Sequence, residues 1–253
     1  MVFLSKYSRL LQCRSVLQLV LASAVISPLA LASFPSSTDQ LLHQDNFDKD
    51  LSKWVVEQAP GGTTRLVNGS LDIDDVGGCT VWFKEKLAGP ILIEYEATMI
   101  QSGGANDRVS DLNCFWMATD PQHPDDLFIN SQKRGGDFKK YDPLQLYYVG
   151  YGANENKTTR FRRYPGDGTK PLLPEHDLKG DKLMNIPNQT IKIQMIADGG
   201  RIQYLRDGET IFDFADKSPF VGGWFGFRTL RNHMKMGRFR VYRLAHQMGT
   251  SKQ

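Results

Sequence analysis

The feature that most constrains this chain is a long succession of short segments in which apolar and polar residues alternate. Ile191, Ile193 and Met195 alternate with Lys192 and Gln194, which is the period of a strand with one buried face. We expect strands at 42–47, 54–58, 64–68, 70–74, 79–83, 90–100, 112–118, 144–151, 158–164, 189–197, 200–206, 210–214, 223–229 and 236–244. No segment sustains a helical period, so the pattern predicts an all-β sandwich or jelly roll.

Glycine-rich turns separate these segments, among them Asn68-Gly69 and Asp207-Gly208. Three longer inserts, 102–110, 119–143 and 165–188, interrupt the regular spacing. Long loops on a rigid β scaffold often carry binding residues, so we expect a functional site near them.

The N-terminus has the composition of a secretory signal peptide. Three basic residues precede an uncharged apolar run over 16–31, which ends in Ala30-Leu31-Ala32. We therefore expect a signal peptide at 1–32, a linker at 33–40, a β-sandwich domain at 41–246 and a C-terminal tail at 247–253. The predicted location is secreted or periplasmic, with no membrane span after cleavage, because the apolar run is short for a bilayer.

Charge argues against a nucleic-acid partner. Without the three basic residues of 1–32, the 31 Lys and Arg residues fall to 28, which equals the 28 Asp and Glu residues. A mature chain close to neutral lacks the general attraction of a basic protein for polyanions.

Cys79 and Cys114 remain after cleavage, and they are equally compatible with one disulfide and with two separate buried thiols. We expect no cofactor and no metal. Structural calcium stays open at two acidic groups, although acidic turns are the favoured interpretation. These groups are Asp120, Asp125 and Asp126 near His123, and Asp72, Asp74 and Asp75.

Two segments each place arginine and aromatic residues on one face. Thr158, Arg160, Arg162 and Tyr164 share a face of 158–164. In 223–229, the face shared by Trp224, Gly226 and Arg228 opposes Phe225 and Phe227.

Four motifs, in their order along the chain, give a resemblance that covers nearly all of the mature domain. They are NFDKDLSKW, RVSDLNCFWMATD, QLYYVGYGANENKTTRFRRY, and GGWFGFRT followed by RNH. The chain resembles the YesU-like group of secreted domains of unknown function in the concanavalin A-like lectin/glucanase superfamily. The resemblance implies a jelly-roll β-sandwich of two curved antiparallel sheets and an association with polysaccharide breakdown.

Hydrolysis is the weaker enzymatic hypothesis, because the Glu-x-Asp-x-x-Glu pattern of laminarinase-type members is absent. Glu94 and Glu96 share a strand face about 7 Å apart, but an exposed pair of this kind is typically a solvated surface.

Elimination from a uronic-acid sugar is the favoured enzymatic hypothesis, because the chain has the arginine, asparagine, tyrosine and histidine residues that this reaction uses. That reaction needs a group that neutralises the carboxylate, a base and an acid. We expect Arg160 or Arg162 with Asn113 to bind the carboxylate, and Tyr147 or Tyr151 with His233 to transfer protons. Neighbouring guanidinium groups would favour the tyrosine phenolate.

Further candidates for sugar contact are Arg108, Arg134 and Arg228, with Trp116 and Trp224 as stacking platforms and Trp54 and Trp82 in the core. Each has a structural alternative, since Trp and Tyr rings also fill cores and arginines also protect sheet edges. The favoured function is therefore a polysaccharide lyase acting on a polysaccharide or oligosaccharide. The alternatives are a non-catalytic lectin-like module, a glycoside hydrolase of the same fold and a structural surface protein.

Overall fold

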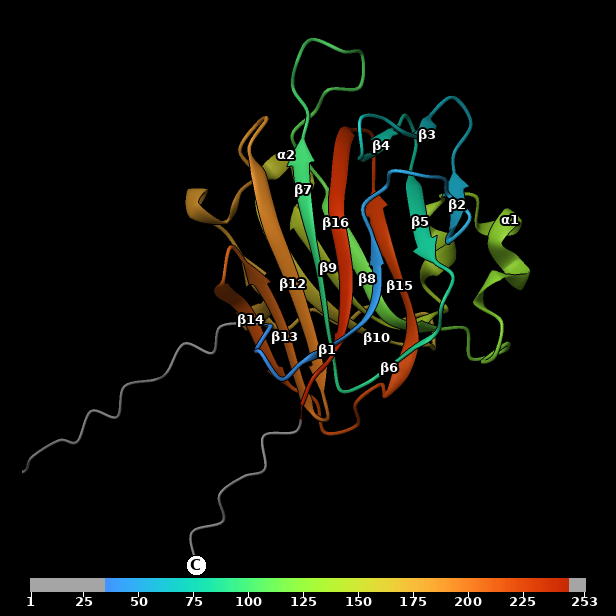
Figure 1. The fold of residues 1–253 in the computed structure, drawn as a ribbon, viewed down its shortest axis with the longest axis vertical. Helices are drawn as coiled ribbons and strands as arrows, with labels where there is room; N and C mark the ends of the chain where they lie inside the picture. The colour runs from blue at the N-terminus through green and yellow to red at the C-terminus, as the bar shows by residue number, and fades with distance from the viewer. Residues whose placement is uncertain (1–34, 246–253) are drawn as a thin grey trace, which may run out of the picture. The chain divides into compact units, whose positions relative to one another are not determined.

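The computed structural model describes residues 35–245, which form two antiparallel sheets packed face to face (Figure 1). The expected signal peptide and the C-terminal tail lie outside the described residues. No helix within residues 35–245 is long and apolar enough to cross a membrane.

Sheet A contains eight strands. Their order is β14 (Glu209–Ala215), β13 (Arg201–Arg206), β12 (Thr190–Asp198), β7 (Ile91–Met99), β16 (His233–Arg243), β4 (Leu71–Asp74) and β3 (Thr63–Leu66), and β1 (Gln40–Asp45) also pairs with β16. The first and last strands of the chain therefore lie side by side.

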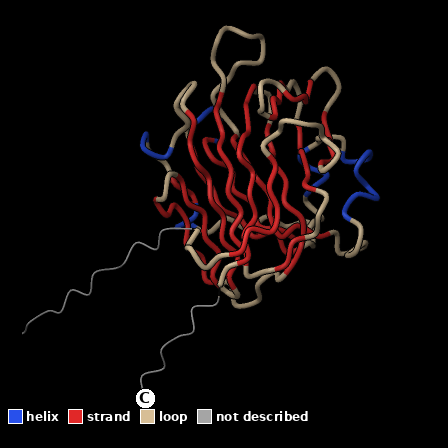
Figure 2. The backbone as a smooth tube through the Cα atoms, viewed as in Figure 1, coloured by secondary structure: helices blue, strands red, loops and turns tan. Residues whose placement is uncertain are grey.

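Sheet B also contains eight strands. Their order is β11 (Asp177–Leu178), β10 (Thr158–Pro165), β9 (Gln145–Gly152), β8 (Leu112–Thr119), β15 (Gly222–Thr229), β5 (Cys79–Phe83) and β2 (Trp54–Gln58), and β6 (Leu87–Ala88) pairs with β15. The expected all-β sandwich and most of the expected strands are confirmed, as the strand-rich tube of Figure 2 shows.

Helical segments are short, and all of those described except α2, which joins β9 to β10, lie in the inserts 119–143 and 165–188. They are η1 (Leu127–Asn130), α1 (Ser131–Arg134), η2 (Phe138–Tyr141), α2 (Ala153–Asn156), η3 (Pro174–His176) and η4 (Asp181–Leu183).

The main core fills the space between the two sheets. Phe225 and Phe227 of β15 point into it, with Trp54 and Phe239 packed against them. This confirms the expected alternation, because Trp224 and Arg228 leave β15 on the opposite side. Cys79 and Cys114 are separate buried thiols, so the disulfide alternative is wrong, and burial raises the pKa of both to about 12.

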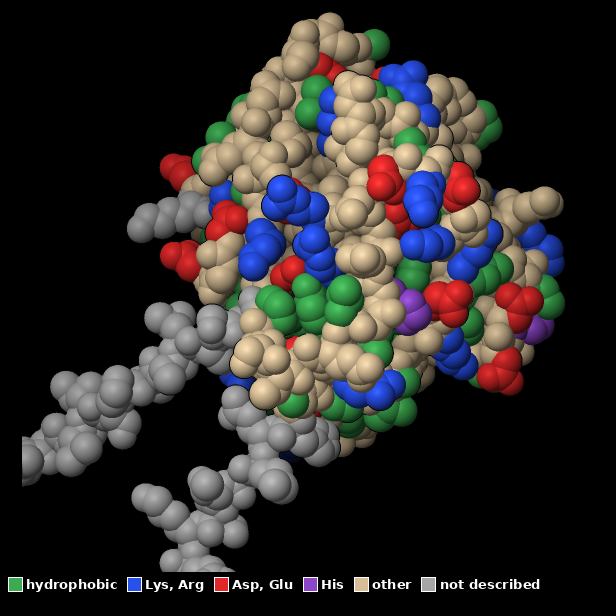
Figure 3. Space-filling view, viewed as in Figure 1, with side chains coloured by type: hydrophobic (Ala, Val, Ile, Leu, Met, Phe, Trp, Pro, Cys, Tyr) green, Lys and Arg blue, Asp and Glu red, His purple; other side chains and the backbone are tan. Residues whose placement is uncertain are grey.

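A second apolar cluster covers the outer face of sheet B. The insert 119–143 lies over this face, where Tyr141 packs on Trp82 and Phe115, and Phe138 packs on Phe115 and Tyr148. The outer face of sheet A is polar instead, and Figure 3 shows basic and acidic side chains interspersed there. Glu94 lies on this face within 3.8 Å of both Lys192 and Arg240, but it is only 7 % exposed, so the expected solvated glutamate pair is wrong for Glu94.

Candidate functional site

One row of directly paired residues crosses the outer face of sheet B. From β11 to β2 the polar row consists of Asp177, Arg160, Gly150, Asn113, Arg228, Thr80 and Glu57. Paired residues in an antiparallel sheet share a face, so these side chains line up about 5 Å apart. The row brings together Arg160, Asn113 and Arg228, three of the residues predicted to bind a sugar.

The β2 end of the polar row is covered by the insert 119–143. Arg134 contacts the Glu57 carboxylate through Nε (3.0 Å) and Nη2 (2.6 Å), and Tyr141 donates its hydroxyl to the same carboxylate (2.6 Å). Arg228 donates Nη1 to the Gly136 carbonyl (2.7 Å). Arg134 and Arg228 are only 3 % and 1 % exposed, so they anchor the insert and do not offer a surface to a ligand. The expectation that they contact sugar is not supported by this placement.

The β11 end of the polar row is open. Arg160 is half-buried and pairs with Asp177 (Nε to Oδ1, 2.8 Å), while Arg162 in the next row donates to the Lys170 carbonyl. Both guanidinium groups keep exposed area beside these partners. Arg160 Nη2 also lies 3.4 Å from Asp177 Oδ2, so Nη1 is the Arg160 nitrogen without a hydrogen bond among residues 35–245. It can donate to a hydroxyl or carboxylate oxygen of a ligand.

Tyr148 is the tyrosine that reaches the polar row. A Cβ atom added at Gly150 would lie 2.5 Å from the Tyr148 hydroxyl, so this hydroxyl lies over Gly150, between Arg160 and Asn113. Sequence reasoning missed this role, although the strand alternation already placed Tyr148 opposite Tyr147 and Tyr151. Burial raises the pKa of Tyr148 well above its usual value, so the phenol is neutral and can donate a hydrogen bond.

A backbone segment in the left-handed conformation borders the row. Asn154, Glu155 and Asn156 have φ values of 53°, 60° and 60°, and Gly152, two residues before Asn154, has a φ of 61°. This conformation costs an L-residue about 1–2 kcal/mol, and such strain concentrates at functional sites. Paired hydrogen bonds hold the segment, since Asn156 donates Nδ2 to the Asn185 carbonyl (2.9 Å) and accepts from its N–H (2.9 Å).

Arg108 and Asp111 connect this segment to two other loops. Asp111, itself at φ 63°, donates its N–H to the Gly152 carbonyl (3.1 Å) and accepts from Arg108 Nη2 (2.8 Å). Arg108 also donates to the carbonyls of Leu230 (2.7 Å) and Arg231 (2.8 Å). We call 108–111, 152–156 and 230–232 the three-loop junction. The Arg108 side chain is 36 % exposed, so it faces solvent while it holds the loops together.

Asn113 links the junction to the row. Its Nδ2 lies 3.4 Å from Asp111 Oδ1, and its Oδ1 is buried without a hydrogen-bond partner. A buried acceptor without a partner costs about 1–3 kcal/mol of folding free energy, so Asn113, like the left-handed segment, is locally unfavourable.

Tyr147 and Tyr151 point into the main core and do not reach this surface. The Tyr147 hydroxyl donates to Asp216 (2.7 Å), and the Tyr151 hydroxyl accepts from Arg206 (2.7 Å). Burial is the largest influence on both groups and raises their pKa values. The expected phenolate is therefore wrong, because the cost of burying a charge outweighs the nearby guanidinium groups.

His233 lies in sheet A with both ring nitrogens occupied. Nδ1 is 2.9 Å from Asp107 Oδ1, and Nε2 is 3.0 Å from Asp72 Oδ2. Burial opposes protonation, but the two carboxylates outweigh it and raise the pKa of His233. The structure therefore does not bring His233 together with either predicted tyrosine, and its contacts fasten the loop around Asp107.

The tryptophans are all largely buried. Trp116 is fully buried in the main core, which leaves no ring face for stacking a sugar. Trp224 is 4 % exposed, lies against Phe128 and donates Nε1 to the Lys84 carbonyl (3.0 Å). The core positions expected for Trp54 and Trp82 are confirmed.

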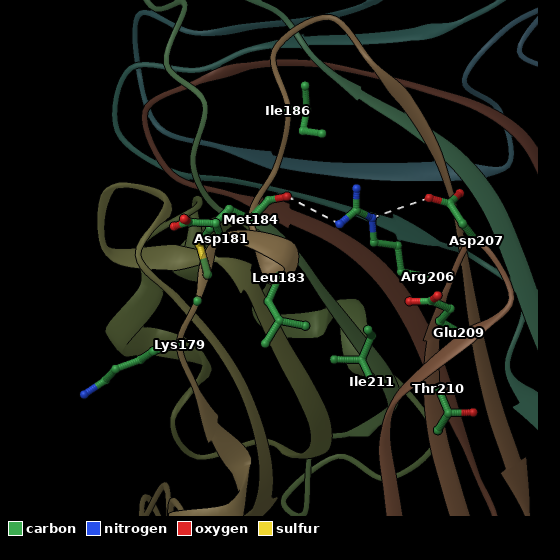
Figure 4. A pocket seen from close by; sticks show the side chains of 11 residues that line it. Lys179, Asp181, Leu183, Met184, Ile186, Arg206, Asp207, Glu209, Thr210 and Ile211 are labelled. Atoms are coloured by element: carbon green, nitrogen blue, oxygen red, sulfur yellow. Dashed lines mark hydrogen bonds and ion pairs between the residues drawn. The ribbon is translucent and has the colours of Figure 1, made fainter.

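A cavity of about 790 Å³ begins where the polar row ends (Figure 4). Lys179, which directly follows β11, lies on one wall, and Arg206 and Glu209 of the β13–β14 hairpin lie on the other. Arg206 contacts the Met184 carbonyl and Asp207 across this space, as Figure 4 shows. Residues 35–245 contain no group of three or more His, Cys, Asp and Glu side chains arranged as a metal site.

Solved structures share this fold. A galectin-like protein of unknown function from Bacillus subtilis matches with a TM-score of 0.65 and 18% identity, over 81% of this chain and 98% of that chain. A lichenase from a mouse hindgut metagenome matches with a TM-score of 0.54 and 13% identity, over 80% and 99%. The exoplasmic/lumenal domain of VIP36 in its Ca2+/Man2-bound form matches with a TM-score of 0.55 and 13% identity, over 82% of this chain and 91% of that chain.

These likenesses agree with the concanavalin A-like fold expected from the sequence. No curated protein gives a significant sequence match. A family profile does match residues 73–239, which contain β5 to β15, every residue of the polar row except Glu57, and the three-loop junction. The chain therefore belongs to the family described as "Domain of unknown function (DUF6250)".

Proposed function

We propose that this protein is an exported glycan-binding protein, and that the sugar binds at the three-loop junction and the open end of the polar row. The observation that carries the proposal is the run of left-handed residues Asn154–Asn156 beside the exposed Arg108 and Arg160. Strain of this kind persists only where the surrounding structure enforces it, and it commonly serves to hold a site in its binding conformation.

The groups available at this surface match the chemistry of sugars. Arg108 and Arg160 each keep an Nη1 group that has no hydrogen bond among residues 35–245. Tyr148, which is 7 % exposed, supplies a neutral hydroxyl, and the Glu155 carboxylate is exposed. Alternating donors and acceptors of this kind can bind vicinal hydroxyl groups, and the arginines can also pair with a sugar carboxylate. Two of the similar structures are a β-1,3-1,4-glucanase and a Ca2+/Man2-bound domain, which agrees with a carbohydrate ligand.

A uronic-acid glycan is the ligand class that we favour, and elimination from it is the second candidate function. The observation in its favour is the Tyr148 hydroxyl between Arg160 and Asn113, because a neutral phenol beside a carboxylate-binding guanidinium can protonate a leaving oxygen. The polar row itself contains no histidine. Binding therefore has more direct support than catalysis. The YesU-like resemblance agrees with a carbohydrate ligand, since three of its motifs contain most of the junction and the row residues Gly150, Asn113, Arg160 and Arg228.

Calorimetry against a panel of neutral and uronic-acid polysaccharides tests the proposal. We expect Arg160→Ala to weaken binding at least about tenfold, which corresponds to about 1.4 kcal/mol. Arg201→Ala is the matched control, because Arg201 makes a similar surface ion pair with Asp213 on the outer face of sheet A. Equal losses in both variants, or no binding by the wild type, would show that the surface is not a glycan site.

The same glycans test elimination through the ultraviolet absorbance of an unsaturated uronate product. Tyr148→Phe keeps the ring and deletes the proton donor, so it should abolish turnover while binding falls only slightly. Binding without product would leave the binding function in place and exclude the lyase.

A further inference from the structure

A second cavity lies on the opposite side of β10 from Arg160, between the edges of the two sheets. It has a volume of about 180 Å³. Its apolar walls are formed by Phe161, Phe214, Pro165, Pro171 and Leu173, with His176 and Arg163 as its polar lining. We call it the His176 cavity.

The walls favour a single flat ring. Phe161 of sheet B and Phe214 of sheet A lie 5.4 Å apart between ring centroids, and Pro171 and Leu173 come from the insert 165–188. The volume equals about six water molecules at roughly 30 Å³ each, which suits one six-membered ring. A sugar ring would bury hydroxyl groups around its whole rim, and two polar side chains cannot satisfy them.

His176 is a polar group without a polar partner in this apolar setting. It is 8 % exposed, and its ring meets Phe161, Phe212 and Phe214 edge-on at 4.9–5.8 Å between centroids. Among residues 35–245 no hydrogen bond to either ring nitrogen is found. Burial lowers the pKa of His176, so the ring is neutral and presents one donor and one acceptor nitrogen. Neither ring nitrogen is sealed from solvent, so a ligand in the cavity can bond to them.

Arg163 supplies positive charge at the same cavity. Nε donates to Asp216 (2.8 Å), Nη2 donates to the Ser218 carbonyl (2.7 Å), and the guanidinium lies 4.1 Å from the Phe220 ring centroid. Nη1 makes no hydrogen bond within the described part of the chain. The arginine is thus held rigidly by two bonds while one end remains available to an anionic oxygen.

We propose that the His176 cavity binds a single aromatic ring that carries a carboxylate. The ligand ring packs against the contacting pair Phe161 and Phe214 on one side and against Pro165 and Pro171 on the other, and the carboxylate bonds to Arg163 and to the N–H of His176. This site is separate from the proposed glycan surface, because Phe161 and Arg163 leave β10 on the other side from Arg160 and Arg162.

An NMR titration of the purified protein with benzoate tests the proposal. For a ligand of this size we expect a dissociation constant on the order of 1 mM, with shifts at Phe161, His176 and Phe214. Benzyl alcohol, which lacks the carboxylate, should bind at least about tenfold more weakly, which corresponds to the loss of one charge-assisted hydrogen bond. Methyl glucoside should not bind in this cavity.

Two variants distinguish binding from loss of folding. His176→Phe keeps the edge-on ring packing and removes the nitrogens, while Leu173→Trp blocks the rim from an exposed position. Each should weaken benzoate binding at least about tenfold. Ile186→Trp, an exposed residue of the 790 Å³ cavity, is the control and should bind as the wild type does.

Four results would overturn the proposal: no saturable benzoate shifts, equal binding of benzyl alcohol, binding of the glucoside in its place, or unchanged benzoate binding by either cavity variant. None of these results bears on glycan binding by the Arg160 surface.

Discussion

Removal of Arg134 should destabilise the protein far more than removal of an arginine from an exposed ion pair. Arg134 and Glu57 are 3 % and 0 % exposed in their side chains, and Arg134 Nη2 also donates to the Leu127 carbonyl (2.8 Å). Arg134→Met leaves the Glu57 carboxylate buried with Tyr141 as its remaining side-chain donor. Breaking a buried pair in this way costs about 3–5 kcal/mol of unfolding free energy.

Urea unfolding at neutral pH measures this cost, and Arg201→Met is the matched control. The Arg201–Asp213 pair is 60 % and 46 % exposed, so its loss should cost about 0–1 kcal/mol. The double variant Glu57→Leu with Arg134→Met should recover much of the stability, because it removes both buried charges.

The reasoning is refuted if Arg134→Met costs no more than Arg201→Met. It is also refuted if the double variant is less stable than Arg134→Met alone, since the cost would then come from lost packing and not from an uncompensated charge. Limited proteolysis gives a second readout, because cleavage within 119–143 should become faster in Arg134→Met.

Three further predictions concern pH, strain and thiol reactivity. The pKa of His233 is raised in the fold, so its stabilising contribution is complete below the unfolded value of about 6.5 and is lost as pH rises through the folded pKa; unfolding curves across this range should show the loss, and His233→Asn should remove it. Glu155→Gly should raise the free energy of unfolding by up to about 1 kcal/mol by relieving the left-handed strain, measured by thermal unfolding; a decrease would show that Glu155 is not strained. Cys79 and Cys114 should react with a thiol reagent only after unfolding, because both are buried thiols with pKa values near 12; rapid reaction of the native protein would contradict their burial.

The sequence predicted the sandwich because strand periodicity reports directly on burial. The alternation in 223–229 correctly separated Phe225 and Phe227 from Trp224 and Arg228. The same rule placed Arg160 and Arg162 on one outer face. Local pattern is sufficient for such statements, since neighbours along a strand alternate whatever the rest of the fold does.

The site was predicted less well, because a side chain on the outer face of a sheet can still be buried by another part of the chain. Arg228 points outward from sheet B, yet the insert 119–143 buries it. Tyr147 and Tyr151 were correctly paired on one face, but nothing local shows that this face is the interior. Which face is covered depends on contacts between distant segments, and those contacts have no periodic signature in the sequence.

The Asn154–Asn156 turn had no strand pattern to reveal it. The sequence GANENKTT indicates a polar loop, and asparagine tolerates a left-handed backbone. Three consecutive left-handed residues, however, are held in place by the hydrogen bond between Asn156 and Asn185, which are 29 positions apart in the chain. Strain enforced by tertiary contacts becomes visible only in the folded molecule.

The insert 119–143 covers one end of the outer face of sheet B, near β2, and leaves the other end, near β11, uncovered. An extended ligand aligned with the polar row from the β11 edge would contact Arg160 and Tyr148 first. It would then meet the backbone around Gly136, which covers Arg228. A ligand on this face therefore meets the Arg160 side of the polar row, whereas the Arg228 side is closed to it by the insert.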